Sequence, residues 1–161
     1  IKEKPSRILC ADMTKAKHGE RLEDLKLMLP YVDYLFPNES EISLVTGETD
    51  CEKNARLLLD AGVKCVVIKQ GAKGCLIRTE QAGYQIPAYP RVACVDTTGA
   101  GDTFAASFMW ALSEGYALEE CGRFSCAAAS IAVESLGAVD GIHSLEQVMT
   151  RYQEMPEAVR L

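Results

Sequence analysis

The sequence lacks a long apolar run and a cluster of basic residues, and each absence excludes a class of protein. The longest uncharged apolar stretch, near residues 104–112, is half of the ~20 residues that a membrane-spanning helix needs, so we expect no transmembrane segment. The 17 Lys and Arg residues are outnumbered by 23 Asp and Glu, which gives a net charge of −6. Because no Lys/Arg-rich run gathers a positive field, we expect no nucleic-acid partner.

The sequence also lacks the closely spaced cysteines of a disulfide framework or a zinc site. Its seven cysteines form an odd set without a C-x-x-C pair, and neither histidine lies near a cysteine cluster. Cys65 and Cys75 sit in apolar runs and Cys126 in an alanine-rich helix, so we expect most cysteines to be small buried residues in a reducing cytoplasm. The chain starts at Ile1 within a charged stretch, and we expect it to be a piece of a longer protein.

What the sequence does contain is an alternation of strand and helix patterns. Short apolar or β-branched runs predict strands at 7–12, 34–36, 63–69 and 91–95, with a small antiparallel pair at 75–78 and 84–86. Helical spacing predicts helices at 22–29 (stopped by Pro30), 38–46, 50–61, 102–114, 118–135 and 145–155. The alternation favours an α/β fold with a mostly parallel sheet, and no linker divides the chain, so we expect one unit.

The strongest motif is D-T-T-G-A-G-D at 96–102, between a predicted strand and a predicted helix. Gly99 and Gly101 allow a sharp turn with unobstructed N–H groups, and the helix dipole adds positive potential, so the turn can bind an anion. Asp102 would repel a phosphate that is merely bound there. It suits a base that acts on the group attacking the phosphate, while the amides stabilise the transferring phosphoryl group.

Other readings of this motif stay open. Asp102 can simply cap the helix in a tight turn. A dinucleotide-binding fingerprint shares the opening Gly99-Ala100-Gly101, but Phe104 occupies the position of its third glycine, and no further strand follows to carry a ribose-binding acid. A P-loop is absent, because no G-K-[ST] occurs.

Two weaker motifs also follow predicted strands. K-Q-G-A-K-G at 69–74 is typical of a β-turn, and N-E-S-E at 38–41 is typical of a helix start with an N-cap and acids in the first turn. Because the carboxyl ends of parallel strands share one ligand-binding edge, we expect both loops and the glycine turn to face one crevice.

Together these motifs resemble the ribokinase-like (PfkB) carbohydrate kinases. The resemblance rests on P-N-E-S-E at 37–41, K-Q-G-A-K-G at 69–74, D-T-T-G-A-G-D at 96–102, and the alanine-rich helix 126–133 followed by L-G-A at 136–138. It implies a three-layer ribokinase-like fold and ATP-dependent phosphorylation of a hydroxyl on a sugar or similar small alcohol. It also implies Mg²⁺ as a cofactor and allows a homodimer of the complete protein.

The resemblance assigns roles by matching positions. Asp102 would be the catalytic base, and the main chain of Gly99, Ala100 and Gly101 would form the anion hole. Glu41, in the N-x-x-E motif, would organise Mg²⁺ through bound water. The residues that would bind the nucleotide are Asn38, Lys69, Gly71, Gly74, Gly101 and Cys126, with Cys126 on the adenine side.

A monovalent cation, K⁺ in particular, is a further implication for many family members. Its ligands, largely backbone carbonyls, would come from Asp96, Thr98, Ala132, Ser135 and Gly137. A further member of that set would fall at Gly141, which offers no side-chain oxygen and leaves the site in doubt.

Two departures from the family pattern concern the rest of the chain. Where relatives often read D-x-N-x-R, this chain has Asp12-Met13-Thr14-Lys15. The family's N-terminal half, with its sugar-gripping glycines and lid, is also missing. We therefore expect residues 1–161 to be the nucleotide-binding and catalytic C-terminal part of a sugar kinase domain, inactive in isolation. Alternatives are a nucleoside or hydroxymethylpyrimidine kinase on the same fold, or a nucleotide-binding fragment without catalysis.

Overall fold

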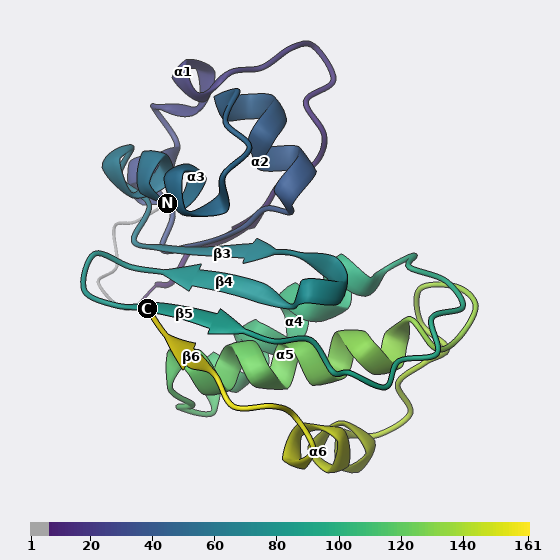
Figure 1. Cartoon of the computed structure of the whole chain (residues 1–161). Coiled ribbons are helices and arrows are strands. Elements are labelled where there is room, and N and C mark those ends of the chain that lie inside the picture. The colour runs from purple at the N-terminus through teal and green to yellow at the C-terminus, as the bar shows by residue number, and fades with distance from the viewer. Residues whose placement is uncertain (1–6) are drawn as a thin grey trace. The chain divides into compact units, whose positions relative to one another are not determined.

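The computed structural model describes residues 7–161, which form two compact units (Figure 1). The first unit contains the described part of Ile1–Gln70 together with Leu76–Gly83, and the second contains Gly71–Cys75 and Tyr84–Leu161. The sequence has no linker and therefore predicts one unit, whereas the contacts within the structure divide the chain into two. No helix among the described residues is long and apolar enough to cross a membrane.

The first unit is built around parallel strands. β1 (Cys10–Asp12) pairs with β2 (Tyr34–Phe36), and β2 pairs with β3 (Cys65–Lys69), both in parallel register. β4 (Cys75–Arg78) follows β3 in the strand order. The helical segments of this unit are α1 (Leu22–Leu25), the 3₁₀ helix η1 (Leu29–Tyr31), α2 (Glu39–Thr46) and α3 (Cys51–Asp60).

The core of the first unit comes from the β-branched residues of β3 and the apolar faces of α2 and α3. Val66 and Ile68 are fully buried in β3, as are Ile42 on α2 and Leu58 on α3. These side chains pack with Leu29, Val32, Leu35, Ala55, Leu59, Val63 and Leu76 in one cluster. This packing fixes the ends of β1, β2 and β3, from which the candidate site residues of this unit start.

Three predicted elements of the first unit are wrong in extent. β3 begins at Cys65 rather than at residue 63. β1 begins at Cys10 rather than at residue 7. The helix predicted over 22–29 is divided into α1 and η1, and Pro30 lies inside η1 instead of stopping a helix. Proline lacks an N–H group but fits the first turn of a helix, where that group has no partner. Leu27, at the division, is 90% exposed, so the apolar spacing does not continue as one buried face.

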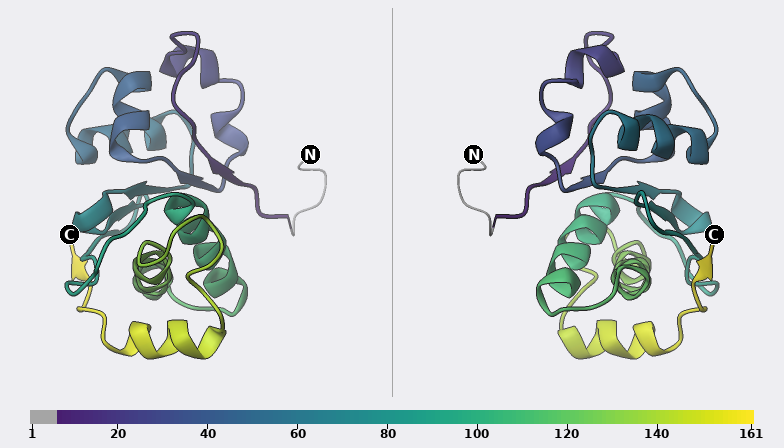
Figure 2. Two further views of the ribbon diagram at one scale, coloured as in Figure 1. Left: turned by 90° about the vertical axis from the view of Figure 1, so that its right-hand side faces the viewer. Right: turned by 90° about the vertical axis from the view of Figure 1, so that its left-hand side faces the viewer.

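The second unit consists mainly of helices. α4 (Ala100–Ser113) and α5 (Leu118–Ala132) pack along each other, and α6 (Leu145–Gln153) packs against α5, as Figures 1 and 2 show. Trp110 of α4 lies 4.8 Å from Phe124 of α5, measured between ring centroids, and Tyr152 of α6 meets Phe124 edge-on. β5 (Gly83–Ile86) pairs antiparallel with β6 (Val159–Arg160), and the short 3₁₀ helix η2 spans Gly71–Lys73.

Four features of the second unit differ from the sequence-based expectation. α6 ends at Gln153, two residues before the predicted end. Residues 91–95, predicted as a strand, form no strand, and Val95 in this segment is 58% exposed. α5 ends at Ala132, three residues before the predicted end, with Val133 as its C-cap. The two-residue strand β6 was not predicted, since so short a segment leaves no recognisable pattern.

Gly74, which precedes β4, provides a first test of the packing. Its φ is +97°, and a Cβ there would clash with the carbonyl oxygen of Ile86. We expect Gly74→Ala in the complete protein to lower the free energy of unfolding by about 2–5 kcal/mol, from backbone strain and overpacking together. Gly71→Ala is the matched control, because Gly71 also has positive φ (+56°) but open space around it. Urea denaturation measures both, and equal losses would contradict the role of the close contact.

Candidate active site

The turn before α4 has the conformation that the glycines of the 96–102 motif predict. Gly99 is the N-cap of α4 and lies in the left-handed region, with φ +75°. A Cβ at Gly99 would lie 2.6 Å from the Cβ of Ala138 and 2.8 Å from its Cα. Both the backbone angle and the close approach of residue 138 therefore require glycine at this position.

The first turn of α4 presents free donors and an exposed acid. The N–H groups of Gly101 and Asp102 donate no hydrogen bond within residues 7–161, whereas the Ala100 N–H donates to the Thr97 carbonyl at 3.2 Å. The Asp102 side chain is exposed and has no hydrogen-bond partner in this part of the chain. The arrangement can therefore bind an anion at the helix start and hold a carboxylate beside it.

Asp96 ties the motif to the loop that follows α5. One carboxylate oxygen accepts hydrogen bonds from the Thr98 N–H (2.9 Å) and the Thr98 hydroxyl (2.8 Å), and the other accepts from the Gly137 N–H (2.9 Å). The amide donors of Thr98 and Gly137, in that order of effect, and then the Thr98 hydroxyl lower the pKa of Asp96. Three of the five predicted cation residues are thus joined by direct hydrogen bonds.

The remaining predicted cation residues lie at the end of α5. Ala132 is the last residue of α5, and the Ser135 N–H donates to its carbonyl at 3.5 Å. A Cβ at Gly141 would lie 2.8 Å from the Cα of Ala132, which explains why this position carries glycine. With the Asp96 oxygens already engaged, the donors that suit a monovalent cation here are backbone carbonyls.

Asn38 and Glu41 form a capping box at the start of α2. The Asn38 side-chain oxygen accepts from the Glu41 N–H, and one Glu41 carboxylate oxygen accepts from the Asn38 N–H, both at 2.8 Å. The motif therefore forms the N-cap and first helical turn that its residues predict. The other Glu41 oxygen has no hydrogen-bond partner among the described residues, so the side chain still fits a metal-bound water.

Lys69 lies at the end of β3, beside the start of α2. Its N–H donates to the Pro37 carbonyl at 2.8 Å, and it forms a parallel bridge with Asn38. Its ammonium group lies 2.8 Å from both carboxylate oxygens of Asp12, at the end of β1. Sequence reasoning did not assign Asp12 to the site. The available signals were an acid at the end of a predicted strand and its place at the start of the stretch where relatives often read D-x-N-x-R.

The remaining nucleotide-binding predictions fall in the second unit. Gly71 is exposed and opens η2, and Gly74 closes the turn by donating its N–H to the Gly71 carbonyl at 3.0 Å. Cys126 is buried on α5, where its sulfur lies 4.0 Å from that of Cys75. Its contact with adenine stays a prediction.

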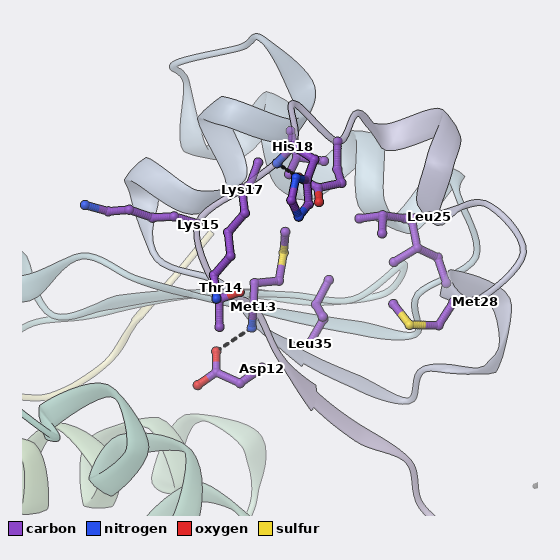
Figure 3. Close-up of a pocket in the computed structure, with 13 residues that line it drawn as sticks. Asp12, Met13, Thr14, Lys15, Lys17, His18, Leu25, Met28 and Leu35 are labelled. Carbon is purple, nitrogen blue, oxygen red and sulfur yellow. Dashed lines mark hydrogen bonds between the residues drawn. The ribbon is translucent and has the colours of Figure 1, made fainter.

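A pocket of about 310 Å³ lies in the first unit, between the loop after β1 and the helices (Figure 3). Its apolar lining residues include Met13, Leu25, Met28 and Leu35. The loop after β1 adds the basic side chains of Lys15 and Lys17 and the imidazole of His18. None of the residues that the sequence assigned to the site lines it. Within residues 7–161, no three His, Cys, Asp or Glu side chains are grouped to hold a metal ion.

Comparison with known proteins identifies the family. Residues 8–145 match the model of the pfkB family of carbohydrate kinases. The chain belongs to this family. The prediction made from the motifs is thereby confirmed.

Among curated relatives of this pfkB-family chain, the ribokinase of Arabidopsis thaliana is 39% identical over 128 residues, which cover 76% of this chain and 34% of the relative. The cytidine kinase of Thermococcus kodakarensis is 39% identical over 111 residues, covering 68% of this chain and 40% of the relative. The chain therefore spans less than half the length of these relatives.

Solved structures confirm the predicted α/β fold with a mostly parallel sheet. Ribokinase from Thermotoga maritima superposes with a TM-score of 0.81 at 37% identity, over 92% of this chain and 50% of the other. Arabidopsis thaliana ribokinase, complexed with ribose and ATP, gives a TM-score of 0.73 at 36% identity, over 80% of this chain and 43% of the other.

Proposed function

We propose that this chain is the nucleotide-binding and phosphoryl-transfer part of an ATP-dependent kinase that phosphorylates a hydroxyl group of a sugar. The start of α4 carries the proposal. There, the N–H groups of Gly101 and Asp102 are free within the described residues, and the exposed Asp102 carboxylate stands in the same turn. Family membership and the ATP in the Arabidopsis ribokinase structure support it.

Phosphoryl transfer needs a general base and a group that stabilises negative charge, and this turn can supply both. The substrate hydroxyl is a poor nucleophile at neutral pH. The Asp102 carboxylate takes its proton as the new oxygen–phosphorus bond forms and the bond between the γ-phosphorus and the departing ADP breaks. The free amides, at the positive end of a 14-residue helix, stabilise the negative charge on the transferring phosphoryl group. Mg²⁺, when bound, neutralises phosphate charge, and the unpaired oxygen of Glu41 would hold its water.

A nucleoside is the second candidate acceptor, because the Thermococcus cytidine kinase is as similar to this chain as the Arabidopsis ribokinase. The complete protein should be assayed for ATP consumption with a panel of pentoses, hexoses and nucleosides. We expect turnover to depend on a sugar. If turnover occurs only with nucleosides, the acceptor is a nucleoside and not a sugar. If neither sugars nor nucleosides are phosphorylated by ATP, the proposed function is wrong.

A cytoplasmic location belongs to the same proposal. None of the seven cysteines forms a disulfide within residues 7–161, and Cys65, Cys75, Cys121 and Cys126 are buried, which suits a reducing compartment.

The role of Glu41 can be tested through its Mg²⁺ dependence. We expect Glu41→Gln in the complete protein to raise the Mg²⁺ concentration for half-maximal rate, because the amide loses charge but keeps the shape of the carboxylate. It should unfold at nearly the wild-type temperature, because the amide oxygen can still accept from the Asn38 N–H. If the Mg²⁺ dependence is unchanged and stability falls by about 0.3–1 kcal/mol, Glu41 is only a helix-start acid.

A further inference from the structure

The lead-in segment, residues 89–95, lies between β5 and the glycine turn (96–102) and forms no strand itself. It is attached instead to the end of α5, because the Val95 and Asp96 N–H groups both donate to the Val133 carbonyl, at 2.7 and 3.2 Å. Val133 is the C-cap of α5. The end of the lead-in segment and the first residue of the turn therefore lie where the end of α5 places them.

The loop that follows α5, residues 133–138, touches the turn at two further points. The Gly137 N–H donates to the Asp96 carboxylate at 2.9 Å. The Cα of Ala138 lies 2.8 Å from the position that a Cβ on Gly99 would take. The turn with the free amides thus rests on this loop, and a displacement of the loop displaces the amides with it.

Glu134, in the same loop, is held by Arg151 of α6. One Glu134 oxygen accepts from Arg151 Nη2 at 3.0 Å, and the other accepts from Nη1 at 3.4 Å and from the Ala93 N–H at 3.5 Å. Arg151 Nη1 also donates to the hydroxyl of Ser130, near the end of α5, at 3.0 Å. A planar guanidinium that donates to both oxygens of a carboxylate holds it in one orientation. Arg151 therefore fixes the place where α5 ends and the loop begins.

Arg151 reaches the start of the lead-in segment through an aromatic ring. Its guanidinium carbon lies 4.2 Å from the centroid of the Tyr89 ring, a distance at which the cation is attracted to the ring face. Tyr89 is buried and is itself fixed, because its hydroxyl donates to Glu154 at 2.6 Å and accepts from Arg91 at 3.0 Å. One side chain of α6 thus holds the lead-in segment at both ends.

A second arginine of this unit has similar surroundings but different connections. The Arg123 side chain, on α5, is 15% exposed, against 20% for Arg151. It also stands over an aromatic ring, that of Tyr152, at 5.2 Å, and pairs with a carboxylate, that of Glu157, at 3.3 Å. Its other hydrogen bonds go to main-chain carbonyls just after α6, and within residues 7–161 none goes to the lead-in segment or to the loop after α5. Only Arg151 has partners that lead to the turn.

We propose that Arg151 is a positioning residue for phosphoryl transfer, which sets the place of the Gly101 and Asp102 amides through Glu134 and Tyr89. The inference rests on the proposed kinase function and deepens it. Arg151 acts by holding the loop and the lead-in segment against the start of α4, and not by touching nucleotide or acceptor. The reaction is sensitive to such placement, because a displacement of about 1 Å caused far from the chemistry can lower the rate about 100-fold.

Kinetics of the complete protein separate positioning from stability. Arg151→Met should lower kcat by about 10- to 100-fold and leave the KM values for ATP and acceptor nearly unchanged, because displaced amides stabilise the transition state less well. Arg123→Met is the matched control, which should lose a comparable amount of thermal stability but keep kcat within about twofold of wild type. If kcat falls no further in Arg151→Met than in Arg123→Met, Arg151 serves the fold alone and the inference fails.

A double variant covers the case in which Arg151→Met fails to fold. Glu134→Met with Arg151→Met removes both charges of the pair and leaves neither unpaired, so it should unfold near the wild-type temperature. We expect it to show the same loss of kcat. A folded double variant with the wild-type kcat would contradict the positioning role.

Amide hydrogen exchange tests the placement without an assay of activity. In Arg151→Met, peptides that cover residues 95–104 should exchange about tenfold faster than in wild type, because the loop that supports the turn has lost charge-assisted hydrogen bonds. Arg123→Met should leave these peptides nearly unchanged. Unchanged exchange in Arg151→Met would overturn the inference, whatever the reaction. Faster exchange, found together with a wild-type protein that phosphorylates neither sugars nor nucleosides, would keep Arg151 as the residue that places the turn and would reject only the proposed function.

Discussion

Replacing Asp102 with Asn in the complete protein should lower kcat by roughly 10²–10⁴-fold, the range for loss of a general base. Asparagine keeps the size of the side chain and its place in the first turn of α4, but it cannot take a proton from the substrate hydroxyl. It also removes a negative charge near the bound phosphates, so the Kd for ATP should stay the same or fall slightly. Steady-state kinetics and calorimetry on the same preparation measure both quantities.

Thermal unfolding separates this role from helix capping. Asp102 is exposed and accepts no hydrogen bond within the described residues, so the melting temperature of Asp102→Asn should stay close to wild type. Glu119→Gln is a matched control, because Glu119 is an acid in the first turn of the neighbouring helix α5. Both substitutions remove one favourable interaction with a helix dipole. If kcat survives within threefold while the melting temperature drops, Asp102 is a helix-start acid and not the base.

Elements that carry local signals could be predicted from the sequence. Asn38 is followed three residues later by Glu41, and the structure forms the capping box that this spacing indicates. Asp50 likewise caps α3, accepting from the Lys53 N–H at 2.8 Å. The glycines of the 96–102 motif predicted a sharp turn, and Gly99 adopts positive φ there. In each case the residue type dictates the backbone within one turn, so distant contacts are not needed.

Features set by distant contacts could not be predicted in the same way. Residues 91–95 carry apolar and β-branched side chains but have no neighbouring strand in the structure, and strand formation depends on a partner. The pairing of Asp12 with Lys69 joins residues 57 positions apart, and only the parallel register of β1, β2 and β3 brings them together. The bond from Asp96 to the Gly137 N–H spans 41 positions and depends on where α5 ends.

The family resemblance supplied roles that local patterns alone leave ambiguous. By itself, N-E-S-E indicates a helix cap, and the structure shows that cap. The role that the resemblance proposes for Glu41, holding Mg²⁺ through bound water, is compatible with this cap because one of its oxygens remains without a partner among the described residues. The same residue can therefore serve the fold with one oxygen and a ligand with the other, which is why its test uses Mg²⁺ dependence as well as stability.

Replacing Gly99 with Ala should damage both stability and catalysis. A side chain at φ +75° is strained, and the new Cβ would lie 2.6 Å from the Cβ of Ala138, so the turn has to shift. We expect a loss of about 2–5 kcal/mol in the free energy of unfolding, from strain and overpacking together. The shift also moves the free amides at the start of α4, and kcat should fall by about 10²–10³-fold, as on removal of one charge-stabilising donor. Denaturant unfolding and steady-state kinetics of the complete protein measure the two effects.

Gly137→Ala separates the contact with Ala138 from the backbone strain. Gly137 has a similar φ of +81°, but no heavy atom lies within 4 Å of its expected Cβ. We expect Gly137→Ala to lower the free energy of unfolding only by the cost of the backbone strain, about 1–2 kcal/mol. Its kcat should stay within tenfold of wild type, because the amides of Gly101 and Asp102 stay in place. If both variants lose kcat equally, the placement of those amides does not depend on the close approach of residue 138, and the turn acts on catalysis only through general stability.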